Sequence, residues 1–177
     1  MRQYISYLPK ILLHPNITPD IRKPRKGSEM KLVILDWGTL DEEDANMRQF
    51  LSNCKCRGLK SVVASSAPEE NVNLGIDAKN LRLLISRTFG RLNNGGGNLR
   101  MIVSQSNVGI KDTLYMSDNP AELQLAKSIG LITVGFRSNG KKSSEVKSAQ
   151  PHFYARSFHD VNQIVENLLR EIPSSTE

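Results

Sequence analysis

Residues 31–40 of the chain read KLVILDWGTL. In the first five of them, Lys31 is followed by a short, continuous apolar run that includes two β-branched residues, which is typical of a strand buried on both faces of a parallel sheet. Asp36 follows this run directly. Because ligands of parallel sheets bind just beyond the carboxyl ends of the strands, Asp36 is the first candidate functional residue.

Strand-like and helix-like segments alternate along the rest of the chain. Further strands are predicted at 61–64, 113–116, 131–136 and 153–155, and helices at 42–57, 71–84, 121–129 and 158–171. Two polar segments, 90–100 and 138–150, are predicted to be loops. Strands that alternate with helices imply right-handed βαβ units. We therefore predict an α/β fold, a Rossmann-like three-layer sandwich with a mostly parallel sheet.

The predicted strand ends carry polar side chains that would meet at one edge of this sheet. These are Asp36, Ser65 and Asp118, with Ser66 and Glu122 close by in the sequence. All of them except Asp36 also have a structural interpretation. Ser65 and Ser66 could cap a helix, and Asp118 or Asn119 could cap the next one with Glu122 in its first turn. The alternatives for these residues are therefore ligand binding and helix capping.

Composition excludes several classes of protein. The chain has 177 residues, of which 38% are hydrophobic and 24% charged, so it can bury a core. It contains no apolar run of the roughly 18 to 20 residues that a membrane span needs. Two cysteines, Cys54 and Cys56, are too few for a disulfide-stapled secreted module or a four-cysteine zinc site. We expect an intracellular protein, placed in the mitochondrion or another organelle or otherwise in the cytoplasm.

The first 30 residues carry most of the net charge of +6. They hold two acidic residues against six basic ones, which are Arg2, Lys10, Arg22, Lys23, Arg25 and Lys26. Four prolines favour an extended arm over a second folded domain. We divide the chain into this basic arm (1–29), an α/β domain (30–172) and a short tail (173–177). The basic residues Arg22, Lys23, Arg25 and Lys26 could contact RNA, an anionic lipid surface or an acidic protein partner, and the alternative is a solvated, flexible leader. If the arm binds a protein partner, its apolar anchors are Tyr4, Leu8 and Leu12.

Three segments resemble motifs of the haloacid dehalogenase-like superfamily, and its phosphoglycolate-phosphatase-like members in particular. Residues 34–40 (ILDWGTL) are similar to the first motif, a strand running into D-x-D-G-T-L. Residues 62–71 (VVASSAPEEN) are similar to the second, a strand ending in a phosphate-binding serine or threonine. Residues 114–123 (LYMSDNPAEL) match the fourth, G-D-x-x-x-D. The resemblance spans residues 30–172 and implies the core of that superfamily.

The resemblance implies a nucleophilic aspartate, with a second acid two residues later that protonates the leaving group. An ungapped alignment on Gly38 places Leu35 at the nucleophile and Trp37 at the acid. If Asp36 is the nucleophile, the acid position is empty or falls on Gly38. On either register the pair of aspartates is broken.

The other implied roles concern phosphate and metal. Ser65 and Ser66 would bind the phosphoryl group, and Asp36, Asp118 and Glu122 would hold Mg²⁺. The lysine of the third motif should stand near Asn93, where none occurs, and Lys111 and Arg100 are the available substitutes.

Two functions follow from these departures. The first is a catalytically degenerate member of the fold, without a required cofactor, that acts as a structural or interaction subunit of a larger, organellar and RNA-containing assembly. The alternative is a magnesium-dependent phosphatase that hydrolyses a phosphate monoester through an aspartyl-phosphate on Asp36. The 28 residues between Asp36 and Ser65 are too few for the cap domain that many members of the superfamily insert there, so we expect a capless site.

Overall fold

The computed structural model of the chain describes residues 30–40, 45–92, 96–137 and 143–170. The predicted arm and tail lie outside these residues. All of the described residues therefore belong to the predicted α/β domain.

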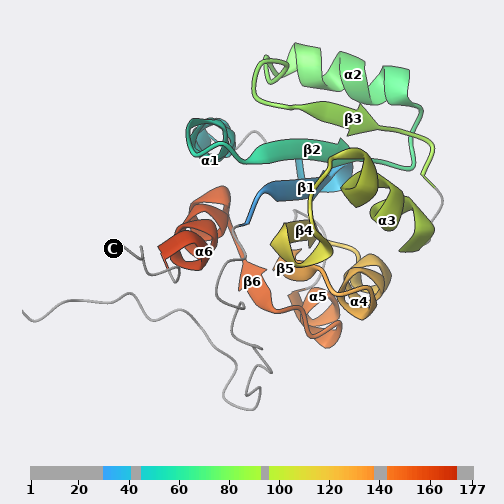
Figure 1. Ribbon diagram of the computed structural model, residues 1–177, viewed down its shortest axis with the longest axis vertical. Coiled ribbons are helices and arrows are strands. Elements are labelled where there is room, and N and C mark those ends of the chain that lie inside the picture. The colour runs from blue at the N-terminus through green and yellow to red at the C-terminus, as the bar shows by residue number, and fades with distance from the viewer. Residues whose placement is uncertain (1–29, 41–44, 93–95, 138–142, 171–177) are drawn as a thin grey trace, which may run out of the picture.

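Six strands form a single sheet in which all five pairings are parallel. The strands are β1 (Leu32–Asp36), β2 (Lys60–Ala64), β3 (Arg87–Phe89), β4 (Thr113–Ser117), β5 (Ile132–Phe136) and β6 (Phe153–Ala155). Their order across the sheet is β3-β2-β1-β4-β5-β6, as Figure 1 shows. The chain reverses its direction of winding between β1 and β4, which makes the carboxyl ends of these two strands the expected ligand site.

Helices cover both faces of the sheet (Figure 1). Apolar residues of α1 (Ala45–Cys56), α2 (Glu69–Ala78) and α6 (Phe158–Arg170) pack on one face, and those of α3 (Gly96–Gln105) and α4 (Pro120–Ser128) on the other. The short helix α5 (Ser143–Ser148) packs against α4, and the 3-10 helices η1 (Trp37–Leu40) and η2 (Ile110–Asp112) flank β1 and β4. The predicted three-layer α/β sandwich is confirmed.

Strand β1 alternates its side chains between the two faces, as its period of two requires. Val33 and Leu35 join the cluster under α1 and α6, whereas Ile34 joins the cluster under α3. All three side chains are completely buried. Burial on both faces explains why the sequence of β1 is a continuous apolar run instead of an alternating one.

Two predictions for the polar segments are wrong. The glycine-rich segment 90–100 contains the start of α3, whose residues Leu99, Ile102 and Val103 are buried against the sheet. Residues 143–148, inside the second predicted loop, form α5, which buries Val146. In both segments a few apolar side chains at helical spacing outweigh the polar composition around them.

The predicted helix over 71–84 begins earlier and ends earlier than expected. Helix α2 spans Glu69–Ala78, and the chain then turns into β3, which was not predicted. Strand β3 has three residues and gains its hydrogen bonds from the edge of β2. So short a strand is stabilised by pairing with a distant segment, which local sequence does not report.

The predicted absence of a cap domain agrees with the described residues. Between β1 and β2 the structure describes η1 and α1, and only positions 41–44 of that connection lie outside the description. The carboxyl edge of the sheet therefore carries no additional domain in the described part of the chain.

None of the described helices has the length and apolar character needed to cross a membrane.

Candidate functional site

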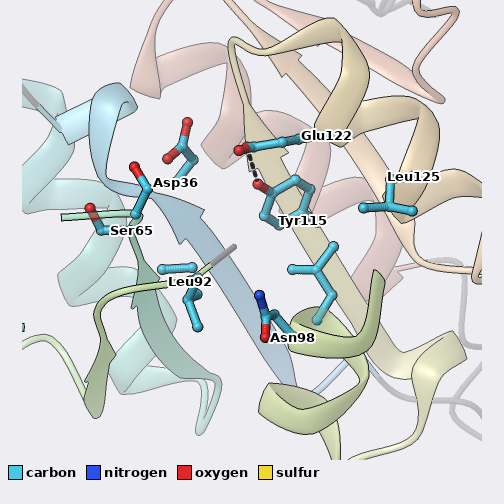
Figure 2. A pocket seen from close by; sticks show the side chains of 10 residues that line it. Asp36, Ser65, Leu92, Asn98, Tyr115, Glu122 and Leu125 are labelled. Atoms are coloured by element: carbon cyan, nitrogen blue, oxygen red, sulfur yellow. Dashed lines mark hydrogen bonds between the residues drawn. The ribbon is translucent and has the colours of Figure 1, made fainter. Parts of the chain in front are cut away.

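A pocket of about 450 Å³, open to solvent, lies at the switch point between β1 and β4. Its lining, part of which Figure 2 labels, comes from β1, β2 and β4, from the segments that follow β2 and β3, and from α3 and α4. The lining residues are Asp36, Ala64, Ser65, Ser66, Leu92, Asn98, Leu99, Tyr115, Glu122 and Leu125. Four of the residues predicted to form a site, Asp36, Ser65, Ser66 and Glu122, therefore share one pocket.

The position of Asp36 decides between the two sequence registers. Leu35 is fully buried in the core under α1, on the face of the sheet opposite the pocket. Asp36 is the last residue of β1 and lines the pocket. Of the two residues, only Asp36 presents a nucleophilic group to the site.

A chain of hydrogen bonds connects the two carboxylates of the pocket. The Ser117 hydroxyl lies 3.0 Å from Oδ2 of Asp36 and 3.1 Å from Oε2 of Glu122. The Tyr115 hydroxyl donates to the same Glu122 oxygen at 2.6 Å, which Figure 2 marks with a dashed line. Since Ser117 has one hydroxyl hydrogen, it can donate to only one carboxylate at a time.

Burial and neighbouring charge change the titration of this network. Desolvation is the main cause that raises the pKa of Asp36 from 3.8 to about 7, and the charges of Glu122 and Asp118 add to it. Hydrogen bonds from Ser117 and from the backbone of Gly38 act in the opposite direction. Burial, together with the charges of Asp36 and Glu122, raises the pKa of Tyr115 well above its usual range. Asp36 is therefore a carboxyl group that gains or loses its proton close to neutral pH.

The two serines occupy the end of β2 without capping a helix. The Ser65 hydroxyl accepts a hydrogen bond from the backbone N–H of Ala67 at 3.0 Å. Helix α2 begins after Pro68, with no side-chain cap, so the N-cap interpretation of Ser65 and Ser66 is wrong. Ser66 is exposed at the pocket. Both serines are placed where a ligand could reach them.

The N-terminus of α4 is capped by Asn119, whose side chain accepts a hydrogen bond from the N–H of Ala121 at 3.0 Å. This confirms one of the two capping residues suggested by the sequence. Glu122 lies in the first turn, but its carboxylate turns to Tyr115 and Ser117. Asp118 is buried and is not among the pocket residues.

The carboxylates of Asp36, Glu122 and Asp118 are the groups near the pocket that could bind Mg²⁺. The charges of Glu122 and Asp118 raise the pKa of Asp36, and a cation would relieve this repulsion. Within the part of the chain that the structure describes, no three His, Cys, Asp or Glu side chains form a metal-binding cluster. Mg²⁺ needs only one or two protein carboxylates, because water and substrate phosphate supply its other ligands. Asp36 and Glu122 are the two pocket carboxylates that such a site would use.

The two candidate positions for a proton donor hold no acid. Trp37 packs its indole against α2, where a Cβ on Gly75 would lie 2.6 Å from two of its ring carbons. A Cβ on Gly38 would lie 3.6 Å from Oδ2 of Asp36, which is an ordinary contact distance. Gly38 therefore leaves room beside Asp36 that no side chain fills.

The predicted lysine substitutes do not reach the pocket. Lys111 is exposed on η2 and Arg100 is exposed on α3, and neither is among the pocket residues. Position 93, where the family lysine was expected, lies outside the described residues. Among the described side chains that line the pocket, none is cationic.

Sequence reasoning missed several residues of the site. Tyr115 and Ser117 belong to a strand that reads as buried core, and both are in fact buried, but their hydroxyl groups hold the carboxylates. Leu92, Asn98 and Leu99 were missed because they lie in the segment interpreted as a loop. The alternation of side chains along β4 could have identified Tyr115, because it places this residue on the face of the sheet opposite Leu114 and Met116.

Comparisons with solved structures find the same fold. A predicted phosphoglycolate phosphatase from Haemophilus somnus matches with a TM-score of 0.62 and 18% identity, over 68% of this chain and 56% of that one. A haloacid dehalogenase-superfamily hydrolase from Ehrlichia chaffeensis matches with a TM-score of 0.58 and 14% identity, over 73% and 62%. The core domain of a Streptococcus pneumoniae protein matches with a TM-score of 0.60 and 12% identity, over 78% of this chain and 96% of that domain.

The chain thus has the fold of haloacid dehalogenase-like hydrolases, as the sequence resemblance implied. It covers 56% of the length of the Haemophilus somnus protein but nearly all of the isolated core domain. No family model matches the sequence, and no curated protein does. At identities of 12 to 18%, the likeness concerns the fold.

Proposed function

We propose that the chain is a phosphatase that hydrolyses a phosphate monoester through an aspartyl-phosphate on Asp36. The observation that carries this proposal is the meeting of Asp36, Ser65 and Glu122 in one pocket at the carboxyl edge of the sheet. The superfamily fold supports it, because solved structures that share this fold include hydrolases described as phosphatases.

Each residue has a role that its position supports. A carboxylate oxygen of Asp36 attacks phosphorus, and the hydroxyls of Ser65 and Ser66 donate hydrogen bonds to the phosphoryl oxygens. Ser117 orients the Asp36 carboxylate through its 3.0 Å hydrogen bond. Asp36 and Glu122 would hold Mg²⁺, and the charge of Asp118, which acts on Asp36, would add to theirs. When bound, the cation supplies positive charge that offsets the repulsion between these carboxylates and a phosphate.

The test is magnesium-dependent phosphate release from small monoesters by the purified full-length chain. The matched variants are Asp36→Asn, which removes the nucleophile, and Asp160→Asn, which changes an aspartate on α6. We expect release by the unchanged protein and by Asp160→Asn, and a loss of at least about 1000-fold in Asp36→Asn, because no other residue forms the covalent intermediate. Equal rates for the two variants would refute Asp36 as nucleophile.

A second candidate is the non-catalytic subunit. It is favoured by the indole of Trp37 at one acid position, by Gly38 at the other and by the lack of a cationic side chain among the described pocket residues. On this proposal the protein belongs to a larger, RNA-containing assembly in the mitochondrion, another organelle or the cytoplasm. Its arm would bind the assembly through Arg22, Lys23, Arg25 and Lys26, with Tyr4, Leu8 and Leu12 as anchors.

The native mass of the protein in a gentle cell extract distinguishes the two candidates. A subunit migrates with its assembly and loses this association when residues 1–29 are deleted, while the melting temperature of the domain stays nearly unchanged. Migration near 20 kDa, the mass of the single chain, would contradict the subunit proposal.

A further inference from the structure

Among its described lining residues, the pocket combines a nucleophilic carboxylate with an apolar wall, and none of these side chains is arranged as an acid for a leaving group. We propose that it selects aryl phosphates, whose leaving group needs no protonation, over alkyl phosphates such as sugar phosphates. This inference rests on the proposed phosphatase function and names its substrate class.

The first supporting observation concerns the proton. The carboxylate of Glu122 accepts a hydrogen bond from the Tyr115 hydroxyl at 2.6 Å and lies 3.1 Å from the Ser117 hydroxyl, so it is directed at these two groups of β4. The Tyr115 proton is directed at Glu122, and no histidine or lysine is found among the described pocket residues. Gly38, two residues after Asp36, has no side chain, and Trp37 packs against α2. No described side chain of the pocket is therefore arranged to protonate a departing oxygen.

The chemistry of the leaving group then decides which esters react. An oxygen of Asp36 bonds to phosphorus as the bond from phosphorus to the ester oxygen breaks, and the electron pair of that bond leaves on the ester oxygen. A phenolate carries this pair unprotonated, since its conjugate acid has a pKa of about 10. An alkoxide, whose conjugate acid is about as weak as water at roughly 16, needs a proton as it departs. Water then attacks phosphorus, the Asp36 oxygen leaves with the bonding pair, and the proton from water passes to solvent.

The second supporting observation is the shape and polarity of the pocket beyond Asp36. In Figure 2, Asp36 and Glu122 lie at one end and Asn98 at the other, with Leu92 and Leu125 on opposite sides. Leu99 adds a further apolar surface from α3. An aromatic ring would bury its faces against these leucines, whereas the hydroxyls of a sugar would lose water there without gaining enough partners.

Three substrates separate the two effects in the full-length protein. Phenyl phosphate has both a good leaving group and a ring, benzyl phosphate has a ring on an alkoxide leaving group, and glycerol 3-phosphate has neither. We expect kcat for phenyl phosphate to exceed that for benzyl phosphate by about 100-fold or more, the usual contribution of a general acid. We expect benzyl phosphate to exceed glycerol 3-phosphate about 10-fold, mainly through a lower KM, because apolar contacts contribute binding.

A restored proton donor provides the matched test. Gly38→Asp should raise kcat for benzyl phosphate about 10-fold relative to that for phenyl phosphate, because a Cβ fits beside Asp36 and a carboxyl there can donate a proton. Gly38→Asn has nearly the same shape without an acidic proton and should keep the original ratio of the two rates. Leu125→Asn should raise KM for phenyl and benzyl phosphate alike.

The outcomes separate this inference from the function on which it rests. Asp36-dependent hydrolysis of glycerol 3-phosphate at the rate of phenyl phosphate would overturn the substrate class and leave the phosphatase proposal standing. If none of the three esters is hydrolysed in an Asp36-dependent way, the phosphatase proposal falls and the substrate class falls with it.

Discussion

Asp36→Asn should stabilise the folded protein at neutral and alkaline pH. The folded chain holds the Asp36 proton up to a pH of about 7, whereas the unfolded chain releases it near 3.8. Between these values the folded state carries more protons than the unfolded state, so the free energy of unfolding falls as the pH rises. A difference of about 3 pKa units corresponds to about 4 kcal/mol, which the folded protein loses between pH 4 and pH 8.

Asparagine escapes this loss because it resembles a protonated aspartate and can donate to Ser117. We expect Asp36→Asn to exceed the unchanged protein by about 2 to 4 kcal/mol at pH 8 and by less than about 1 kcal/mol at pH 4. Urea denaturation of both proteins at a series of pH values, with a chelator present, measures the difference.

Asp77→Asn is the control for this experiment, because Asp77 pairs with Arg82 and the pKa of its carboxyl is lowered by that hydrogen bond. Its effect should have the opposite sign, with a small loss of stability at pH 8 that disappears at low pH. A pH-independent difference between Asp36→Asn and the unchanged protein would refute the reasoning. A less stable Asp36→Asn at pH 8 would do so as well.

Three further predictions concern two packing contacts and one partly buried histidine. Gly75→Ala should lower the free energy of unfolding by about 1 to 3 kcal/mol, because the added Cβ would lie 2.6 Å from the ring of Trp37. This loss is expected although alanine favours a helix. Combining Gly75→Ala with Trp37→Ala should remove the clash, and denaturation curves of both variants measure the difference. Leu114→Ala, in the centre of the sheet, should cost about 2 to 4 kcal/mol, and a near-neutral result in the same assay would contradict its complete burial. His152 accepts a hydrogen bond from the N–H of Thr133 at 3.1 Å, and burial lowers its pKa below 6.5. Acid below pH 6.5 should therefore destabilise the unchanged protein, and melting temperatures of His152→Asn should lack this part of the pH dependence.

Much of the fold could be predicted because its central strands are buried on both faces. The apolar runs of β1, β2, β4 and β5 are continuous for that reason. Each of these strands carries a residue that is completely buried, as Ile34, Val63, Leu114 and Val134 show. Strand β3 could not be predicted in the same way, since its three residues are held by pairing with β2. Helix α3 was missed because Gly96, Gly97 and Asn98 at its start have low helix propensity.

The candidate site was predictable to a smaller extent. Parallel strands bring their carboxyl ends to one edge, so Asp36, Ser65 and Glu122 could be grouped before any coordinates were known. Which of Leu35 and Asp36 faces the pocket depends on the phase of β1, and sequence alignment left that open. The roles of Tyr115 and Ser117 depend on hydroxyl positions within 3.1 Å of Glu122, which no sequence pattern reports.

The contact between Trp37 and Gly75 also constrains how this protein could evolve. An aspartate at position 37 would remove the indole that packs against α2. Gly75 would then stay within the helix, where glycine is unfavourable, without making room for an indole. Acquiring a side chain at position 75 first would collide with the indole at 2.6 Å. Each single step lowers stability, and only the two together reach a well-packed alternative. The two positions therefore have to change together, and a proton donor could be introduced by a single substitution more readily at position 38 than at position 37.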